Sequence, residues 1–156
     1  MGGSFDVAVV GSGIGAVATE LAQYGAATVY QVESSALASY TAPAYAQGFE
    51  VAVKASGATY VLAAATAKGK DTTPRLAARL GAGQASDVIA INGDGSQLTY
   101  TRPMWAGSVL GQVKVNTEVT VLTVRTTGFD AAQGGQGQSA VETLSADIDV
   151  ASLRME

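Results

Sequence analysis

The chain has 156 residues, of which 47% are hydrophobic and 14% are charged, so it is long enough for one domain with a full hydrophobic core. Its formal net charge is −4 and its nine Lys and Arg residues are scattered along the sequence, which argues against a surface that follows nucleic-acid phosphates. The chain contains no Cys and no His, which excludes disulfides, thiolate metal sites, Cys nucleophiles and Ser-His or Cys-His mechanisms. We therefore predict no catalytic residue and no metal site. The longest uncharged stretch, 34–49, contains Pro43 and several polar residues, so no membrane insertion is expected.

The first half of the chain predicts alternating strands and helices. Strands are expected at 5–10, 28–32 and 59–65, the last of them fully buried, and helices at 17–23, 44–55 and 72–80. This order implies a parallel sheet with helices on both faces.

From residue 85 the pattern changes to short strands without helices. They are expected at 86–91, 98–102, 108–113 and 119–124. The turn signal Asn92-Gly93-Asp94-Gly95 separates the first two, so an antiparallel or mixed extension of the sheet is predicted. Beyond Arg125, the stretch DAAQGGQGQSA loses apolar periodicity and indicates a flexible linker followed by a short tail.

A glycine-rich turn, GSGIGA, lies between the first predicted strand and the first predicted helix. It has the form G-x-G-x-x-A, and Glu33 follows Gly11 by 22 positions, close to where a carboxylate that binds ribose would sit. Gly11, Gly13, Ala16 and Glu33 are therefore candidate residues for a dinucleotide site. Small residues are also what a tight turn between a strand and a packed helix requires, so both interpretations stay open at this point.

Three motifs in the second half carry a resemblance to a known family. They are GKDTTPRLAARLGAGQASDVIAI (69–91), TRPMWAGSVLGQVKV (101–115) and VLTVRTTGFDAA (121–132). They resemble, in the same order, the G-K-x-x-x-P-R-x-A-x-x-L, R-P-I-Y-A-G-N-A and V-x-T-V-R-T-T-x-F-D-A-A motifs in the N-terminal domain of the electron transfer flavoprotein α subunit. DVAVVGSGIGAVA lies where the family carries a similar V-A-G-S-G-x-G-A-V-A stretch, so the resemblance covers about residues 3–135.

The chain also departs from that family. It starts at the family's second strand, so the first strand-helix unit is not seen, and it stops before the second domain. Trp105 stands where Tyr is usual, and Lys68 stands where the family tends to have Phe.

The resemblance implies a fold and a division of the chain. The fold class is α/β, a three-layer and mostly parallel sheet of the adenine-nucleotide-hydrolase-like or Rossmann-like kind with short antiparallel extension strands. Residues 1–127 would form the domain, and 128–156 a linker and tail toward an absent FAD domain. The glycine turn would then be structural.

The resemblance also implies a function. The family carries electrons from acyl-CoA-type dehydrogenases, as in fatty acid β-oxidation, through FAD to a quinone reductase or similar acceptor. FAD would sit in the absent domain and AMP in the partner β subunit, so no cofactor is expected in this chain. The chain would be a scaffold and partner-binding domain of an αβ heterodimer, not an enzyme, in a bacterial cytoplasm or mitochondrial matrix.

Two alternatives stay open, one from the glycine turn and one from the likeness of the resembled domain to nucleotide-binding α/β folds. One is an NAD(P)- or FAD-binding oxidoreductase fragment that uses Gly11, Gly13, Ala16 and Glu33, and the other is a stand-alone adenine-nucleotide-binding module.

Arg102, Met104, Trp105 and Arg125 are the candidate residues for the partner interface. Trp and Arg are enriched at protein interfaces, although the alternative that Trp105 fills the core is equally open. Lys70 is expected in solvent at a helix start rather than on a bound anion.

Overall fold

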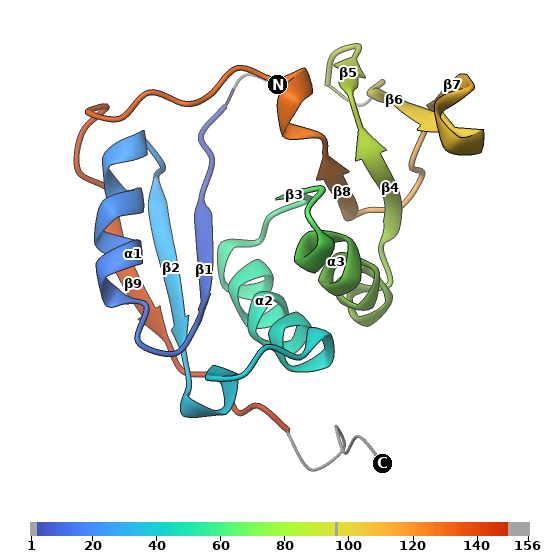
Figure 1. Cartoon of the computed structure of the whole chain (residues 1–156). Coiled ribbons are helices and arrows are strands. Elements are labelled where there is room, and N and C mark those ends of the chain that lie inside the picture. Colours follow the sequence, from blue (N-terminus) through green and yellow to red (C-terminus); the bar gives the residue numbers. More distant parts are fainter. Residues whose placement is uncertain (1–2, 96, 150–156) are drawn as a thin grey trace. The chain divides into compact units, whose positions relative to one another are not determined.

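The computed structural model describes residues 3–95 and 97–149 (Figure 1). The chain divides into two compact units. The central unit spans Ala58–Ala131, and the flanking unit combines the described residues before Ala58 with those after Ala131. Each unit is an α/β structure, so the predicted fold class is confirmed, with the parallel strands divided between two sheets of three strands each.

The flanking unit is a parallel sheet between two helices (Figure 1). Its strands are β1 (Val7–Gly11), β2 (Thr28–Glu33) and β9 (Ala140–Leu144), in the order β1-β2-β9. Its helices are α1 (Gly15–Leu21) and α2 (Ala42–Ser56). The glycine turn thus ends β1 and begins α1, as its sequence predicts.

The two faces of this sheet are covered by different helices because successive side chains of a strand point to opposite faces. Val29 of β2 is fully buried against Ala18 and Ala22 on the α1 side. Val32, three positions later, is fully buried in a second cluster with Val10 and with side chains of α2. The small residues of both helices let them approach the sheet closely.

Strand β9 corrects the expectation that the segment after residue 127 is only a linker and tail. Residues Ala140–Leu144 pair in parallel with Thr28–Val32 of β2, and Ile148 is buried in the α2 cluster. The pairing is made by backbone groups, and a five-residue strand behind a run of Gly and Gln is too short to show a clear alternation.

The central unit contains a parallel sheet and a separate antiparallel one. Its elements are β3 (Tyr60–Ala64), α3 (Ala67–Leu80), β4 (Gly83–Val88), β5 (Ala90–Asn92), β6 (Thr99–Met104), β7 (Val109–Val113) and β8 (Thr120–Val124). The parallel sheet has the order β3-β8-β4, and the antiparallel sheet the order β5-β6-β7.

Two expectations for these strands need correction. The strand at 119–124 is expected in an antiparallel or mixed extension of the sheet, but β8 is the buried middle strand of the parallel sheet. The strand expected at 59–65 is not fully buried, because Tyr60 and Leu62 of β3 are 38% and 46% exposed. Among the described residues β3 pairs only with β8. It is therefore an edge strand, and part of its apolar run is exposed.

Helix α3 begins earlier than expected, at Ala67 rather than Thr72. The hydroxyl of Thr66 caps the helix by accepting a hydrogen bond of 3.1 Å from the Gly69 amide. Gly69 packs directly on the end of β3, since a Cβ built there would lie 2.0 Å from the Ala64 carbonyl oxygen. This contact brings Lys70 to the carboxyl end of the parallel sheet. In the part of the chain that the structure describes, no helix is both long and apolar enough to cross a membrane.

Replacing Gly69 with Ala is expected to destabilise the central unit, by about 1–3 kcal/mol, because the new methyl group meets backbone that has to move. Urea unfolding measures the change. Gly15→Ala is the control, since a Cβ there meets nothing within 4 Å and Ala favours the helix. Equal unfolding midpoints for the two variants would contradict the close approach.

Candidate functional site

The candidate site is built on an irregularity in β4. The pairing of β4 with β8 shifts register between Ala85 and Val88, and Asp87 within the bulge has a φ of 59°, in the left-handed region. A hydrogen bond to the core holds the bulge in place, because the Asp87 amide donates at 2.8 Å to the hydroxyl of the fully buried Thr123. A bulge at the end of a strand re-aims a side chain, and here it aims the Asp87 carboxylate at the residue that follows β8.

That residue is Arg125, which holds Asp87 with two hydrogen bonds. Arg125 donates from Nε to Oδ1 at 3.1 Å and from Nη2 to Oδ2 at 2.5 Å, the bidentate geometry that a guanidinium offers a carboxylate. Lys70 Nζ lies 3.6 Å from Oδ1. The expectation that Lys70 is simply in solvent is thus corrected, although its side chain is 49% exposed.

Asp87, Arg125 and Lys70 form an ion cluster, which holds the Asp87 carboxyl in its charged form. The hydrogen bonds from Arg125 are the main cause that lowers the pKa of Asp87 below its ordinary value of 3.8, and the charge of Lys70 adds to them, while partial burial opposes them. The same contact raises the pKa of Arg125. Asp87 was not among the residues predicted from the sequence. The feature that could have indicated it is its charge, the only one in the run from Leu80 to Asn92.

A hollow of about 350 Å³ opens beside this cluster. It brings together all four of the residues expected at a partner interface, which are Arg102, Met104, Trp105 and Arg125. Arg102 is fixed by a 2.8 Å hydrogen bond from its Nε to the Ser86 carbonyl, so β6 is tied to the bulge of β4. The hollow lies beyond the carboxyl ends of β4 and β8, where open parallel sheets place their binding sites.

One rim of the hollow is a strained turn, Trp105–Gly107, between β6 and β7. All three residues have positive φ, 52° for Trp105, 54° for Ala106 and 92° for Gly107, and only glycine adopts such values without strain. Trp105 is 79% exposed, so it does not fill the core, which was the alternative open from the sequence. The turn holds a large apolar side chain in solvent at a conformational cost.

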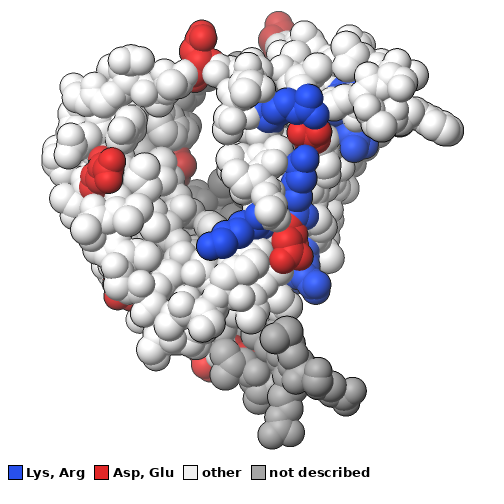
Figure 2. Space-filling view, viewed as in Figure 1, with Lys and Arg blue, Asp and Glu red and all other residues white. Residues whose placement is uncertain are grey.

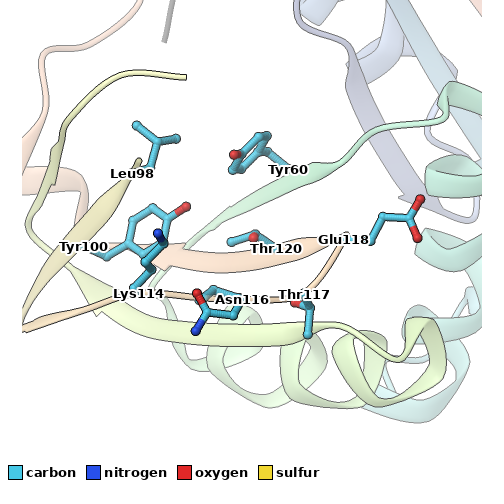
Figure 3. Close-up of a pocket in the computed structure, with 9 residues that line it drawn as sticks. Tyr60, Leu98, Tyr100, Lys114, Asn116, Thr117, Glu118 and Thr120 are labelled. Atoms are coloured by element: carbon cyan, nitrogen blue, oxygen red, sulfur yellow. The ribbon is translucent and has the colours of Figure 1, made fainter. Parts of the chain in front are cut away.

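A second hollow, of about 380 Å³, lies at the amino ends of β3 and β8, where Tyr60 and Thr120 line it (Figure 3). The hydroxyls of Tyr60 and Tyr100 face the same space, while the carboxylate of Glu118 lies away from both (Figure 3). Burial raises the pKa of the Tyr100 hydroxyl, which also bonds to Thr120. Tyr100 is 2% exposed and belongs to the hydrophobic core of the central unit, so its place in this hollow is accounted for by packing.

The glycine turn belongs to the flanking unit. Gly11 pairs with Glu33 in the β1–β2 register, and the Gly13 amide donates a 2.9 Å hydrogen bond to Glu33 Oε1. Gln31 Nε2 donates to the other carboxylate oxygen at 2.7 Å. The candidate set of Gly11, Gly13 and Glu33 is therefore assembled, with Ala16 exposed nearby in α1, but the carboxylate bonds to the turn itself. Within the described residues no group of three or more acidic residues is placed to hold a metal ion.

The ion cluster should stabilise the folded chain by an amount that depends on pH. Because the pKa of Asp87 is lowered by folding, its contribution is present above the unfolded pKa and is lost as pH falls through the folded pKa. Asp87→Asn keeps a residue that tolerates positive φ but removes the charge. The variant should have a lower urea midpoint than the parent at about pH 7, and the difference should shrink at about pH 3.

The control is Asp130→Asn, which removes an exposed carboxylate outside the cluster. A constant difference between parent and Asp87→Asn across this pH range would show that the ion pair adds nothing to stability.

Comparison with known proteins identifies the family. The model of the electron transfer flavoprotein domain matches residues 1–149. The chain is 34% identical over 149 residues to the electron transfer flavoprotein subunit alpha of Pseudomonas aeruginosa, covering 96% of this chain and 47% of the relative. It is 31% identical over 147 residues to the subunit of the same name from Bacillus subtilis, covering 94% and 45%.

A mitochondrial relative is similar over a shorter stretch. It is a probable electron transfer flavoprotein subunit alpha from Cryptococcus neoformans, 38% identical over 101 residues, which cover 64% of this chain and 28% of the relative. The chain thus spans less than half the length of the relatives it matches. With a family model that covers almost the whole chain and relatives that share the subunit name, this chain belongs to the electron transfer flavoprotein family and is a homologue of its α subunits.

Proposed function

We propose that this chain is the N-terminal scaffold and partner-binding part of an electron transfer flavoprotein α subunit. The observation that carries the proposal is the hollow beside Asp87, which gathers a strained, 79% exposed Trp105 and two arginines on one rim of the central unit. Such a group of side chains is costly in an isolated chain and typical of a protein interface. The family supplies the partner, a β subunit, since an α subunit is named as one member of a pair.

In the complete protein the chain would serve electron transfer without its own redox centre. The α and β subunits would pass electrons from acyl-CoA-type dehydrogenases through FAD to a quinone reductase or a similar acceptor. The described part of this chain contributes rigid contacts to that assembly, in the bacterial cytoplasm or the mitochondrial matrix. Its share of the function is the recognition of the partner.

The glycine turn does not fit FAD. The amide of Gly13, which would face a pyrophosphate at the glycine turn, is already bonded to Glu33. Helix α1 has only seven residues, so its dipole adds little to an anion site. The glycine turn is therefore not a flavin site in the proposed function.

Calorimetric titration of the pure chain with FAD, NADH and AMP is expected to show no specific binding. The physical reason is that Glu33 satisfies the donor that a phosphate would need. The decisive comparison is Glu33→Ala. Micromolar binding to the parent that the variant loses would establish the oxidoreductase or nucleotide-module alternative with Gly11, Gly13, Ala16 and Glu33 as its site.

Replacing Trp105 with Ala is expected to weaken association with the β subunit from the same genome by roughly tenfold or more, as for an aromatic side chain at the centre of an interface. Co-purification and a titration by biolayer interferometry measure the change. Circular dichroism should show an unchanged fold, because the side chain is exposed.

Phe5→Ala is the matched control, since Phe5 is an aromatic residue with 51% exposure in the flanking unit. Equal affinity of the parent and Trp105→Ala would remove the hollow from the interface. No association of the parent chain at all would contradict the proposed function itself.

A further inference from the structure

The charges of the chain are divided unequally between its two units. The central unit holds seven Lys and Arg residues and five Asp and Glu residues, a net charge of +2, whereas the rest of the chain holds two basic and eight acidic residues, a net charge of −6. On the face shown in Figure 2, Lys and Arg side chains gather over α3 and the carboxyl ends of the neighbouring strands. The candidate site is therefore locally basic in an acidic protein.

The hollow has more positive charge than its own residues neutralise. Arg125 and Lys70 contact the Asp87 carboxylate, and Arg102 lines the same hollow, in which Asp87 is the one acidic lining residue. Asp87 engages two of the five N–H donors of the Arg125 guanidinium, so further donors remain for a second acceptor. The side chains of Arg125 and Lys70 are about half exposed, which leaves both within reach of a binding partner.

An apolar surface adjoins this basic group. Met104 pairs with Val109 across β6 and β7, so these two apolar side chains lie on one face of the hairpin, while the next pair, Pro103 and Leu110, faces the other side. Trp105, Val109 and Leu110 are 79%, 52% and 62% exposed. Exposed apolar side chains bordered by charge mark an interaction surface, because an isolated chain gains nothing from exposing them.

Backbone strain points to the same place. In the described ranges the non-glycine residues with positive φ are Asp87, Trp105 and Ala106, and all three line this hollow. Strain of this kind persists where the surrounding structure over-determines it, and it collects at binding sites. The charge, the apolar patch and the strain are independent observations that coincide at one site.

We infer that the hollow binds an acidic and apolar segment of the β subunit, whose carboxylate shares Arg125 and Lys70 with Asp87 while its apolar side chains cover Met104 and Trp105. The inference deepens the proposed function and rests on it. Asp87 then has a definite role in the free chain, because it is the internal carboxylate that occupies part of the basic site and competes with the carboxylate of the partner.

The charge pattern favours a protein segment over nucleic acid. Two cations that contact one fixed carboxylate, with Arg102 in the same hollow, do not form a track for successive phosphates, and the chain as a whole is negative. A small anion has no apolar groups that could cover the exposed apolar side chains. A segment that combines a carboxylate with apolar residues matches both halves of the site.

The test compares variants with opposite expected signs in titrations of the full chain with the β subunit, at low and at high salt. Asp87→Asn should strengthen binding roughly threefold or more at low salt, because the competing carboxylate is removed. Lys70→Gln should weaken it by a similar factor and flatten its dependence on salt. Trp105→Ala should weaken binding at both salt concentrations and leave the salt dependence unchanged.

The matched control is Lys114→Gln, which removes a positive charge from the same unit at the other hollow and should leave the affinity unchanged. Urea midpoints, measured in parallel, verify that each variant is folded. If Asp87→Asn is folded and binds more weakly, or if Lys70→Gln binds as tightly as the parent, the inference is overturned while the proposed function stands. If the parent chain does not bind the β subunit, the proposed function fails first.

Discussion

The bidentate contact between Arg125 and Asp87 is the interaction on which the candidate site depends. It joins the residue after the central strand β8 to a bulge near the end of β4, at an edge to which α3 also brings Lys70. The contact is possible only because Asp87 adopts a left-handed backbone conformation, which an amide hydrogen bond to buried Thr123 supports. In the free chain this carboxylate pairs with Arg125 and Lys70 and so occupies part of the basic site.

The same edge of the sheet anchors the hairpin that carries the exposed turn. Arg102 bonds to the carbonyl of Ser86, so the antiparallel hairpin is anchored to the bulge of the parallel sheet. Beyond this anchor the chain passes through three consecutive residues with positive φ, and Trp105 extends into solvent. An exposed aromatic side chain of this size is typical of an anchor residue at an interface.

The glycine turn shows how a fold-level motif can lack its usual ligand chemistry. The turn has the expected form and lies between β1 and α1, and Glu33 lies beside it in register with Gly11. Its carboxylate accepts the Gly13 amide hydrogen bond, so a group that would bind ribose in a dinucleotide site stabilises the turn from within. The spacing alone did not distinguish these two roles, because both need the carboxylate at the end of the same strand.

The sequence by itself determined the α/β class, the alternation of the first six elements and the family, because hydrophobic periodicity and ordered motifs are local properties of the chain. It also selected Arg102, Met104, Trp105 and Arg125 as interface candidates from their residue types. Only the tertiary structure placed β8 between β3 and β4, added β9 beside β2 and brought Asp87 to Arg125 across 38 positions. Strand pairing and ion pairing join residues that are distant in the chain, and the bulge that turns Asp87 depends on the register of β4 against β8, which no local pattern encodes.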